Sequence, residues 1–163
     1  MTLIAAVDNR WGIGFRGAPL FRVSADLRRF RALTKGHALL MGRKTFDSLP
    51  QREGLPGLLP GRAHVVLSRD PHFTRPGVAV LRSLDEARDY ARTRETFLIG
   101  GGELYAALLD DCGRALITKI DAYRPADAFM PDLDAMPGWR LREESPWMEE
   151  DGIRFRYCVY ERT

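Results

Sequence analysis

Two kinds of segment alternate along the chain. Short, nearly continuous apolar runs are typical of strands buried on both faces of a parallel sheet, and segments with helical periodicity separate them. Beyond Pro125 the pattern changes to the alternation of antiparallel strands, with a turn at Asp151-Gly152. The predicted strands are Thr2–Val7, His37–Met41, Arg62–Leu67, Val78–Leu81, Thr96–Ile99, Arg114–Ile120, Trp139–Glu144 and Ile153–Glu161.

This order of segments predicts an α/β fold in a single domain over residues 1–163. We expect a mostly parallel central sheet of about eight strands, flanked by helices, with an antiparallel C-terminal hairpin at its edge. Residues 50–61 are rich in Pro and Gly, which predicts a surface loop and not a linker between domains. The sequence Ser83-Leu84-Asp85-Glu86 is a capping box that predicts a helix to about Arg94.

One predicted helix carries a carboxylate, Asp26, beside its apolar face. Ser24 is its expected N-cap, and Gly36 follows its C-terminal end. Two readings of Asp26 are open: an exposed acid favoured by the helix dipole, or a carboxylate in an apolar cleft with a raised pKa and oxygens offered to a ligand. The residues expected to face the protein are Leu27, Phe30 and Leu33, and those expected to face solvent are Arg28, Arg31 and Lys35.

Three glycine-rich segments differ in what they predict. Gly12–Gly17 matches the pattern G-x-G-x-x-G, but no helix follows it, so we reject a dinucleotide fingerprint and expect a mobile loop that can fold over a ligand. Gly42 opens a short helix whose backbone N–H groups suit a phosphate, although Arg43 and Lys44 are equally compatible with solvated side chains. Gly100–Gly102 joins a strand to the helix Glu103–Leu109, which indicates a close backbone approach or dihedral angles that side chains forbid.

Composition limits the possible partners. The net charge is +3 and the arginines are dispersed, so we expect no nucleic-acid partner, although a modest positive field favours small anionic ligands. The apolar runs are too short to span a bilayer and no signal peptide is evident, so we expect no membrane association. Two cysteines make no disulfide framework, so we expect a reducing cytoplasm, and we also expect a monomer. Cys112, Cys158 and the three histidines lack the spacing of metal ligands, so no metal site is expected.

The candidate residues occur in an order and spacing that resemble bacterial dihydrofolate reductases, and the resemblance spans essentially the whole chain. Each motif alone is common, but the ordered set is specific. The matching segments are Leu3–Val7, Trp11–Gly14, Ala25–Leu27 with Phe30, Met41–Thr45, Leu59–Arg62, Leu67–Arg69, Ile99–Tyr105 and Thr118–Asp121.

The resemblance implies NADPH-dependent reduction of 7,8-dihydrofolate to tetrahydrofolate, and inhibition by antifolates. It implies a catalytic set of Asp26, Phe21 and Thr118, in which Asp26 holds the pterin and favours protonation of its N5 atom by water. The implied substrate contacts are Ile4, Ala5, Leu27, Phe30, Leu49, Arg62 (for the glutamate tail), Ile99 and Thr118. The implied NADPH contacts, with a cis peptide between Gly100 and Gly101, are Ala6, Ile13, Gly14, Gly42, Arg43, Lys44, Thr45, Leu67, Ser68, Arg69, Ile99, Gly100, Gly101, Gly102, Glu103, Leu104 and Tyr105.

The chain departs from the family pattern at two places. Phe21 stands where the family has Trp, so a donor to an ordered water near Asp26 is lost, and Ser24 replaces the usual Pro. A second tail contact at Arg52 is not assigned. The rival interpretations are a reductase of the riboflavin-biosynthesis type, against which Asp26 and Arg62 argue, and a non-catalytic nucleotide-binding module, against which Asp26 and Thr118 argue.

Overall fold

The computed structural model describes residues 1–49 and 59–163, and its main feature is a nine-stranded sheet. The strand order is β10-β12-β8-β1-β7-β4-β5-β6, with β11 paired to β12. Neighbours from β8 to β6 are parallel, whereas β12 pairs antiparallel with β8, β10 and β11. The predicted parallel sheet with an antiparallel C-terminal edge is therefore confirmed. The strands are β1 Thr2–Val7, β4 Ala38–Gly42, β5 Ala63–Leu67, β6 Val78–Leu81, β7 Thr96–Gly100, β8 Arg114–Ile120, β10 Trp139–Glu144, β11 Met148–Glu150 and β12 Ile153–Arg162.

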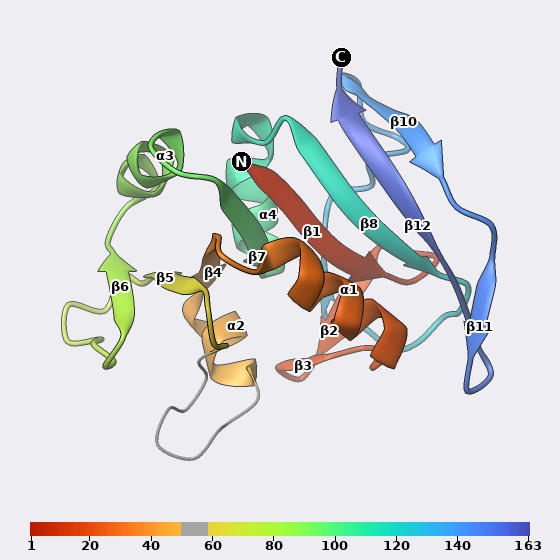
Figure 1. Cartoon of the computed structure of the whole chain (residues 1–163), viewed down its shortest axis with the longest axis horizontal. Coiled ribbons are helices and arrows are strands. Elements are labelled where there is room, and N and C mark those ends of the chain that lie inside the picture. Colours follow the sequence, from red (N-terminus) through yellow and green to blue (C-terminus); the bar gives the residue numbers. More distant parts are fainter. Residues whose placement is uncertain (50–58) are drawn as a thin grey trace.

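Helices cover both faces of this sheet (Figure 1). Helix α1 crosses one face over β1 and β8, and α4 lies on the opposite face. Within the described residues, no helix is both long and apolar enough to cross a membrane. The helices are α1 Ser24–Thr34, α2 Arg43–Ser48, α3 Leu84–Arg92, α4 Gly102–Leu108 and the short 3-10 turn η1 Leu109–Asp111.

The central strands are buried on both sides because their apolar residues serve two layers in turn. On β1, Leu3 packs in the layer that contains α4, and Ile4 packs in the layer that contains Phe30 of α1. On β8 the same alternation places Ile117 on the α4 side and Leu116 on the α1 side. Because successive strand residues point to opposite faces, Thr118 also faces α1.

The segment predicted as a glycine-rich loop is a β-hairpin in the structure. Residues 12–19 form two short strands, β2 Gly12–Phe15 and β3 Ala18–Pro19, which build a three-stranded sheet with β9 Ala128–Phe129. The turn between β2 and β3 uses Arg16 at φ 50° and Gly17 at φ 78°. The missing helix after these glycines confirms that they are no dinucleotide fingerprint. The loop prediction fails because the strand that pairs with β2 lies far along the chain.

Helix α1 begins one residue earlier in its capping pattern than the sequence predicts. Val23 and not Ser24 is the N-cap, and Ser24 is the first helical residue. Its backbone N–H donates to Glu150 Oε2 at 2.6 Å, so a carboxylate from β11 caps the helix instead of a local hydroxyl. The prediction that Leu27 packs against the protein is also wrong, because its side chain is 45% exposed.

Candidate active site

Asp26 is held against β8 by Thr118. The Thr118 hydroxyl, which is 3% exposed, donates to Asp26 Oδ1 at 2.5 Å. Burial raises the pKa of the Asp26 carboxyl, and both this hydrogen bond and the positive charge of Arg29 act in the opposite direction. The second reading of Asp26, a carboxylate with a raised pKa, is therefore the one that the structure supports.

Apolar side chains surround this carboxylate on the α1 side of the sheet. Ile4 is buried in the layer beneath α1, and Phe30, Leu49 and Ile99 pack against that layer while staying partly exposed. A flat apolar ligand could contact these partly exposed edges. Ala5 packs into the α4 layer, so its side chain faces away from them.

Phe21 belongs to a small apolar cluster at the N-terminal end of α1. It packs with Ala6 and Ala25 against buried apolar residues. The guanidinium of Arg124 lies 4.1 Å from the centre of the Phe21 ring and donates to the carbonyl of Leu20 at 2.6 Å. A phenyl ring at this position is therefore held by stacking, without the hydrogen bond that an indole could donate.

Arg62 is directed to the C-terminal end of α1. Its Nε donates to Thr34 Oγ1 at 2.9 Å, and one terminal nitrogen donates to the carbonyl of Arg31 at 2.5 Å. The other terminal nitrogen donates to the carbonyl of Pro60 at 2.5 Å. These bonds fix the guanidinium beside α1, where the resemblance expects the glutamate tail. Arg52, the other expected tail contact, lies outside the described residues.

Two glycine turns meet at the carboxyl ends of β4 and β7. A side chain on Gly42 would lie 3.9 Å from the carbonyl oxygen of Gly100. Gly100 has φ +133°, and the peptide between Gly100 and Gly101 is cis. A side chain on Gly100 would lie 3.1 Å from Thr45 Oγ1, and one on Gly102 would overlap the carbonyl oxygen of Phe129. The triple glycine thus combines a left-handed backbone with a close approach of β9.

The core side of this turn is rigid. Tyr105 is 3% exposed and its hydroxyl donates to the carbonyl of Ile4 at 2.7 Å, which ties α4 to β1. Leu104 is also buried, whereas Glu103 is exposed. The side chains of Leu104 and Tyr105 are therefore not available to a ligand at the turn.

A group of cationic and hydroxyl side chains lies beside these turns. Arg43 makes an ion pair of 3.1 Å with Asp70 and stacks 4.6 Å from the centre of the Phe73 ring, which draws α2 to the segment after β5. Ser68 is buried in that segment, and Lys44 and Arg69 are exposed. This group can hold a phosphate next to the glycine turns.

Comparison with known proteins assigns the chain to one family. The family model described as dihydrofolate reductase matches residues 1–162. The chain belongs to the dihydrofolate reductase family. It is 39% identical to the dihydrofolate reductase of Mycobacterium tuberculosis (strain ATCC 25618 / H37Rv) over 165 residues, covering 99% of this chain and 97% of that protein. It is 40% identical to the dihydrofolate reductase type 3 of Salmonella typhimurium over 152 residues, covering 93% of this chain and 90% of that protein.

A solved dihydrofolate reductase has the same fold. The structure of the enzyme from Enterococcus faecalis complexed with NADP(H) and RAB-propyl matches with a TM-score of 0.84 at 28% sequence identity, covering 99% of this chain and 95% of that one. The family resemblance and the fold class expected from the sequence are confirmed.

Three residues of this dihydrofolate reductase site escape the sequence reasoning. Arg29 and Tyr157 flank Asp26 and Thr118, and Arg124 supports Phe21. Tyr157 lies on the strand predicted at the sheet edge, and its alternation with Phe155 could have placed it on the α1 face. No local signal connects Arg124 to Phe21.

Proposed function

We propose that the chain reduces 7,8-dihydrofolate to 5,6,7,8-tetrahydrofolate with NADPH, and that Asp26 assists protonation of the pterin N5 atom. The observation that carries this proposal is a half-buried carboxylate, bonded to Thr118, within a chain that matches the dihydrofolate reductase family over its whole length. The alternatives of a riboflavin-type reductase and of a non-catalytic module are not favoured by that match.

In this proposal, Asp26 and Thr118 orient the substrate. The ionised carboxylate accepts hydrogen bonds from the 2-amino group and the N3 side of the pterin, and Thr118 fixes the carboxylate in place. A negative charge in a partly dry site stabilises a positive charge that develops on the pterin ring, so protonation of N5 by water becomes easier. Ile4, Phe30 and Ile99 exclude water from the ring faces.

NADPH, when bound, supplies the hydride. The residues present fit it because the turn at Gly100–Gly102 and the start of α2 at Gly42 lie close together, next to hydroxyl and cationic groups. We propose that Ala6, Ile13 and Gly14 contact the nicotinamide side, and that the turn from Ile99 to Tyr105 with Gly42 and Thr45 holds the pyrophosphate. Arg43, Lys44, Leu67, Ser68 and Arg69 bind the 2′-phosphate and adenine side.

For the rest of the substrate we propose that Leu27 and Leu49 contact the aryl group, that the backbone of Ala5 borders the pterin, and that Arg62 pairs with the glutamate tail. The 45% exposure of Leu27 supports this, since an exposed leucine gains burial when a ligand covers it. We also propose a single domain over residues 1–163 that acts as a cytoplasmic monomer, takes antifolates as inhibitors and binds no nucleic acid.

The test is the oxidation of NADPH with dihydrofolate, followed spectrophotometrically in wild type and Asp26→Asn. We expect the variant to lose most hydride transfer at neutral pH and to recover part of it in acid, where the substrate protonates unaided. Asp89→Asn is the control, because Asp89 is an exposed acid of α3 that pairs with Arg92. Equal rates for wild type and Asp26→Asn would contradict the role of Asp26, and a wild type without activity would contradict the function.

A further inference from the structure

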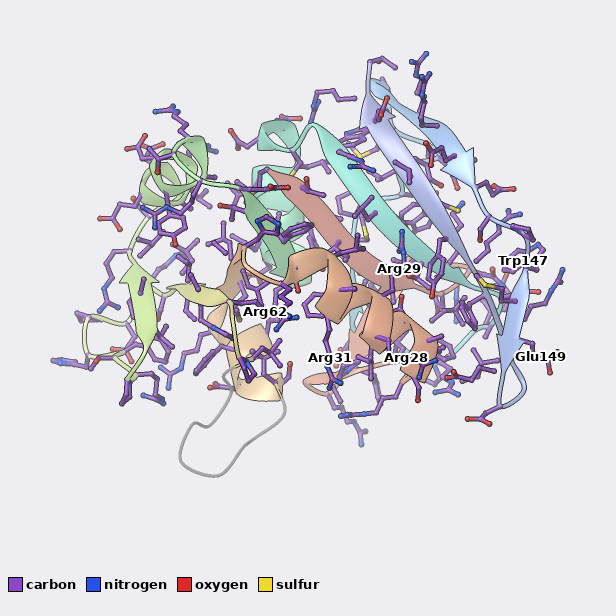
Figure 2. All side chains as sticks on the ribbon, viewed as in Figure 1. Arg28, Arg29, Arg31, Arg62, Trp147 and Glu149 are labelled. Atoms are coloured by element: carbon purple, nitrogen blue, oxygen red, sulfur yellow. The ribbon has the colours of Figure 1, made fainter. Side chains whose placement is uncertain are left out.

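Arg29 is a half-buried arginine on the helix that carries the candidate catalytic acid. In Figure 2 it lies on the side of α1 that faces β8 and β12, whereas Arg28 and Arg31 lie on the opposite side. Its guanidinium carbon is 4.0 Å from the centre of the Tyr157 ring, the geometry of a cation–π contact. In the described part of the chain, no carboxylate lies within ion-pair distance of Arg29, whereas Arg28 approaches Glu150 at 4.0 Å.

The partner of Arg29 is connected to Asp26 through the sheet. Tyr157 on β12 is directly opposite Thr118 on β8, so both side chains lie on the face under α1. Thr118 donates to Asp26, and Asp26 precedes Arg29 by three residues, which puts both on neighbouring positions of the helix surface. Asp26, Thr118, Tyr157 and Arg29 therefore close a ring that joins α1, β8 and β12.

The stacking contact restricts what Arg29 can do. A guanidinium held over the Tyr157 ring keeps its charge close to Asp26, but it does not bond to the carboxylate oxygens. Thr118 occupies Oδ1, and Oδ2 accepts from no other described residue, so one oxygen stays available to a ligand. An arginine in direct ion-pair contact would instead compete with the ligand for both oxygens.

We propose that Arg29 is an electrostatic positioning residue: held on Tyr157, it keeps Asp26 ionised in a half-buried place and leaves the carboxylate open to the substrate. This rests on the proposed function in so far as Asp26 is the acid that binds the pterin. The other charged or titratable groups that act on this region are Tyr157 and Cys158 from β12, Arg114 from β8, Glu150 from β11, and Arg28 from α1 itself.

The directions of the pKa shifts agree with this arrangement. The charge of Arg29 lowers the pKa of Asp26 against the larger effect of burial. Burial lowers the pKa of Arg29, and the nearby Tyr157 and Asp26 oppose that shift. Removal of Arg29 should therefore raise the pKa of Asp26 and also ease protonation of a bound pterin. The rate of hydride transfer is expected to fall as the pH rises. Both effects shift the midpoint of that fall to higher pH.

The test compares Arg29→Gln with Arg28→Gln. Both variants remove one positive charge, and the two residues are adjacent on one helix. Only Arg29→Gln removes the charge that lies next to Asp26 and Tyr157. The pKa of Asp26 is measured in the ligand-free protein by NMR with 13C-labelled aspartate, which needs no activity. We expect Arg29→Gln to raise it by roughly half a unit and Arg28→Gln to leave it nearly unchanged. The pH profile of hydride transfer should move by a similar amount in the same direction.

The stacking is tested at Tyr157. Tyr157→Phe keeps the aromatic face and should match wild type, whereas Tyr157→Leu should behave like Arg29→Gln. Arg29→Lys, which keeps the charge, should leave the pKa of Asp26 close to that of wild type, and it guards against a simple folding defect. Equal shifts in Arg28→Gln and Arg29→Gln, or none in the latter, would overturn the proposal. A wild-type protein that oxidises no NADPH would overturn the proposed function and leave the NMR result to decide about Arg29.

Discussion

Glu150 fixes the N-terminal end of the helix that carries Asp26. Its Oε2 accepts the N–H of Ser24 at 2.6 Å and its Oε1 accepts the N–H of Ala25 at 3.2 Å. The first N–H groups of a helix have no partner within the helix, and a negative charge there is attracted to the positive end of the helix dipole. Because the Glu150 side chain is only 25% exposed, solvent screens these bonds incompletely.

Replacement of Glu150 by alanine removes two charge-assisted hydrogen bonds and the favourable charge. Helix caps of this kind contribute about 1–2 kcal/mol, which corresponds to a fall in Tm of about 2–8 °C for a chain of this size. Glu150→Gln keeps one acceptor oxygen and loses the charge, so we expect about half that loss. The KM for dihydrofolate should rise in both variants, because a frayed first turn displaces Asp26.

Glu149 provides the control. It is the preceding residue of β11 and is exposed, on the opposite face of the strand (Figure 2). We expect Glu149→Ala to change the free energy of unfolding by less than about 0.5 kcal/mol. Urea denaturation measures the stabilities, and steady-state kinetics measures KM. If Glu150→Ala unfolds at the same urea concentration as Glu149→Ala, the cap does not stabilise α1 and the reasoning is refuted.

Two further variants test the glycine turn and the cost of burying Asp26. In Gly102→Ala the new methyl group would overlap the carbonyl of Phe129, so we expect a loss of about 1–3 kcal/mol in stability and weaker NADPH binding by fluorescence titration, whereas Gly113→Ala, which has open space around it, should change neither. Because burial raises the folded-state pKa of Asp26, its stabilising contribution is complete below the unfolded pKa of about 4 and is lost as the pH rises through the folded pKa. Asp26→Asn should therefore be more stable than wild type at neutral pH, with a difference in Tm that shrinks toward about pH 4; a difference that grows in acid would falsify this.

The central sheet could be predicted because its signal is local. Five of the six residues of β1 and four of the seven of β8 are apolar, and these apolar residues pack on both faces of the sheet. The strands that escaped prediction are short, and β2 also depends on a distant partner. β2 pairs with β9, where Gly12 lies opposite Phe129, and β11 pairs with β12 across the turn at Asp151-Gly152. Neither β2 nor β11 has an apolar run that would mark it in isolation.

The triple glycine shows how far a local pattern reaches. Its occurrence between strand and helix predicted either unusual dihedral angles or a close approach. The structure has both, since Gly100 adopts a left-handed φ and Gly102 lies against Phe129. The sequence could not show which glycine needs the left-handed φ and which needs the close approach, because the backbone that approaches Gly102 belongs to β9.

The same limit explains why Asp26 was found while the supports of its helix were not. The helical period marks a carboxylate beside an apolar face, but the position of α1 is set by residues from other parts of the chain. Glu150 binds its N-terminal end, Thr118 holds its first turn, and Arg62 binds its C-terminal carbonyls. The two end contacts have the charges that a helix dipole favours, negative at the start and positive at the end. A carboxylate that must stay half-buried with an open oxygen needs a helix fixed in this way, because a small tilt of α1 would expose Asp26 to water and lower its pKa.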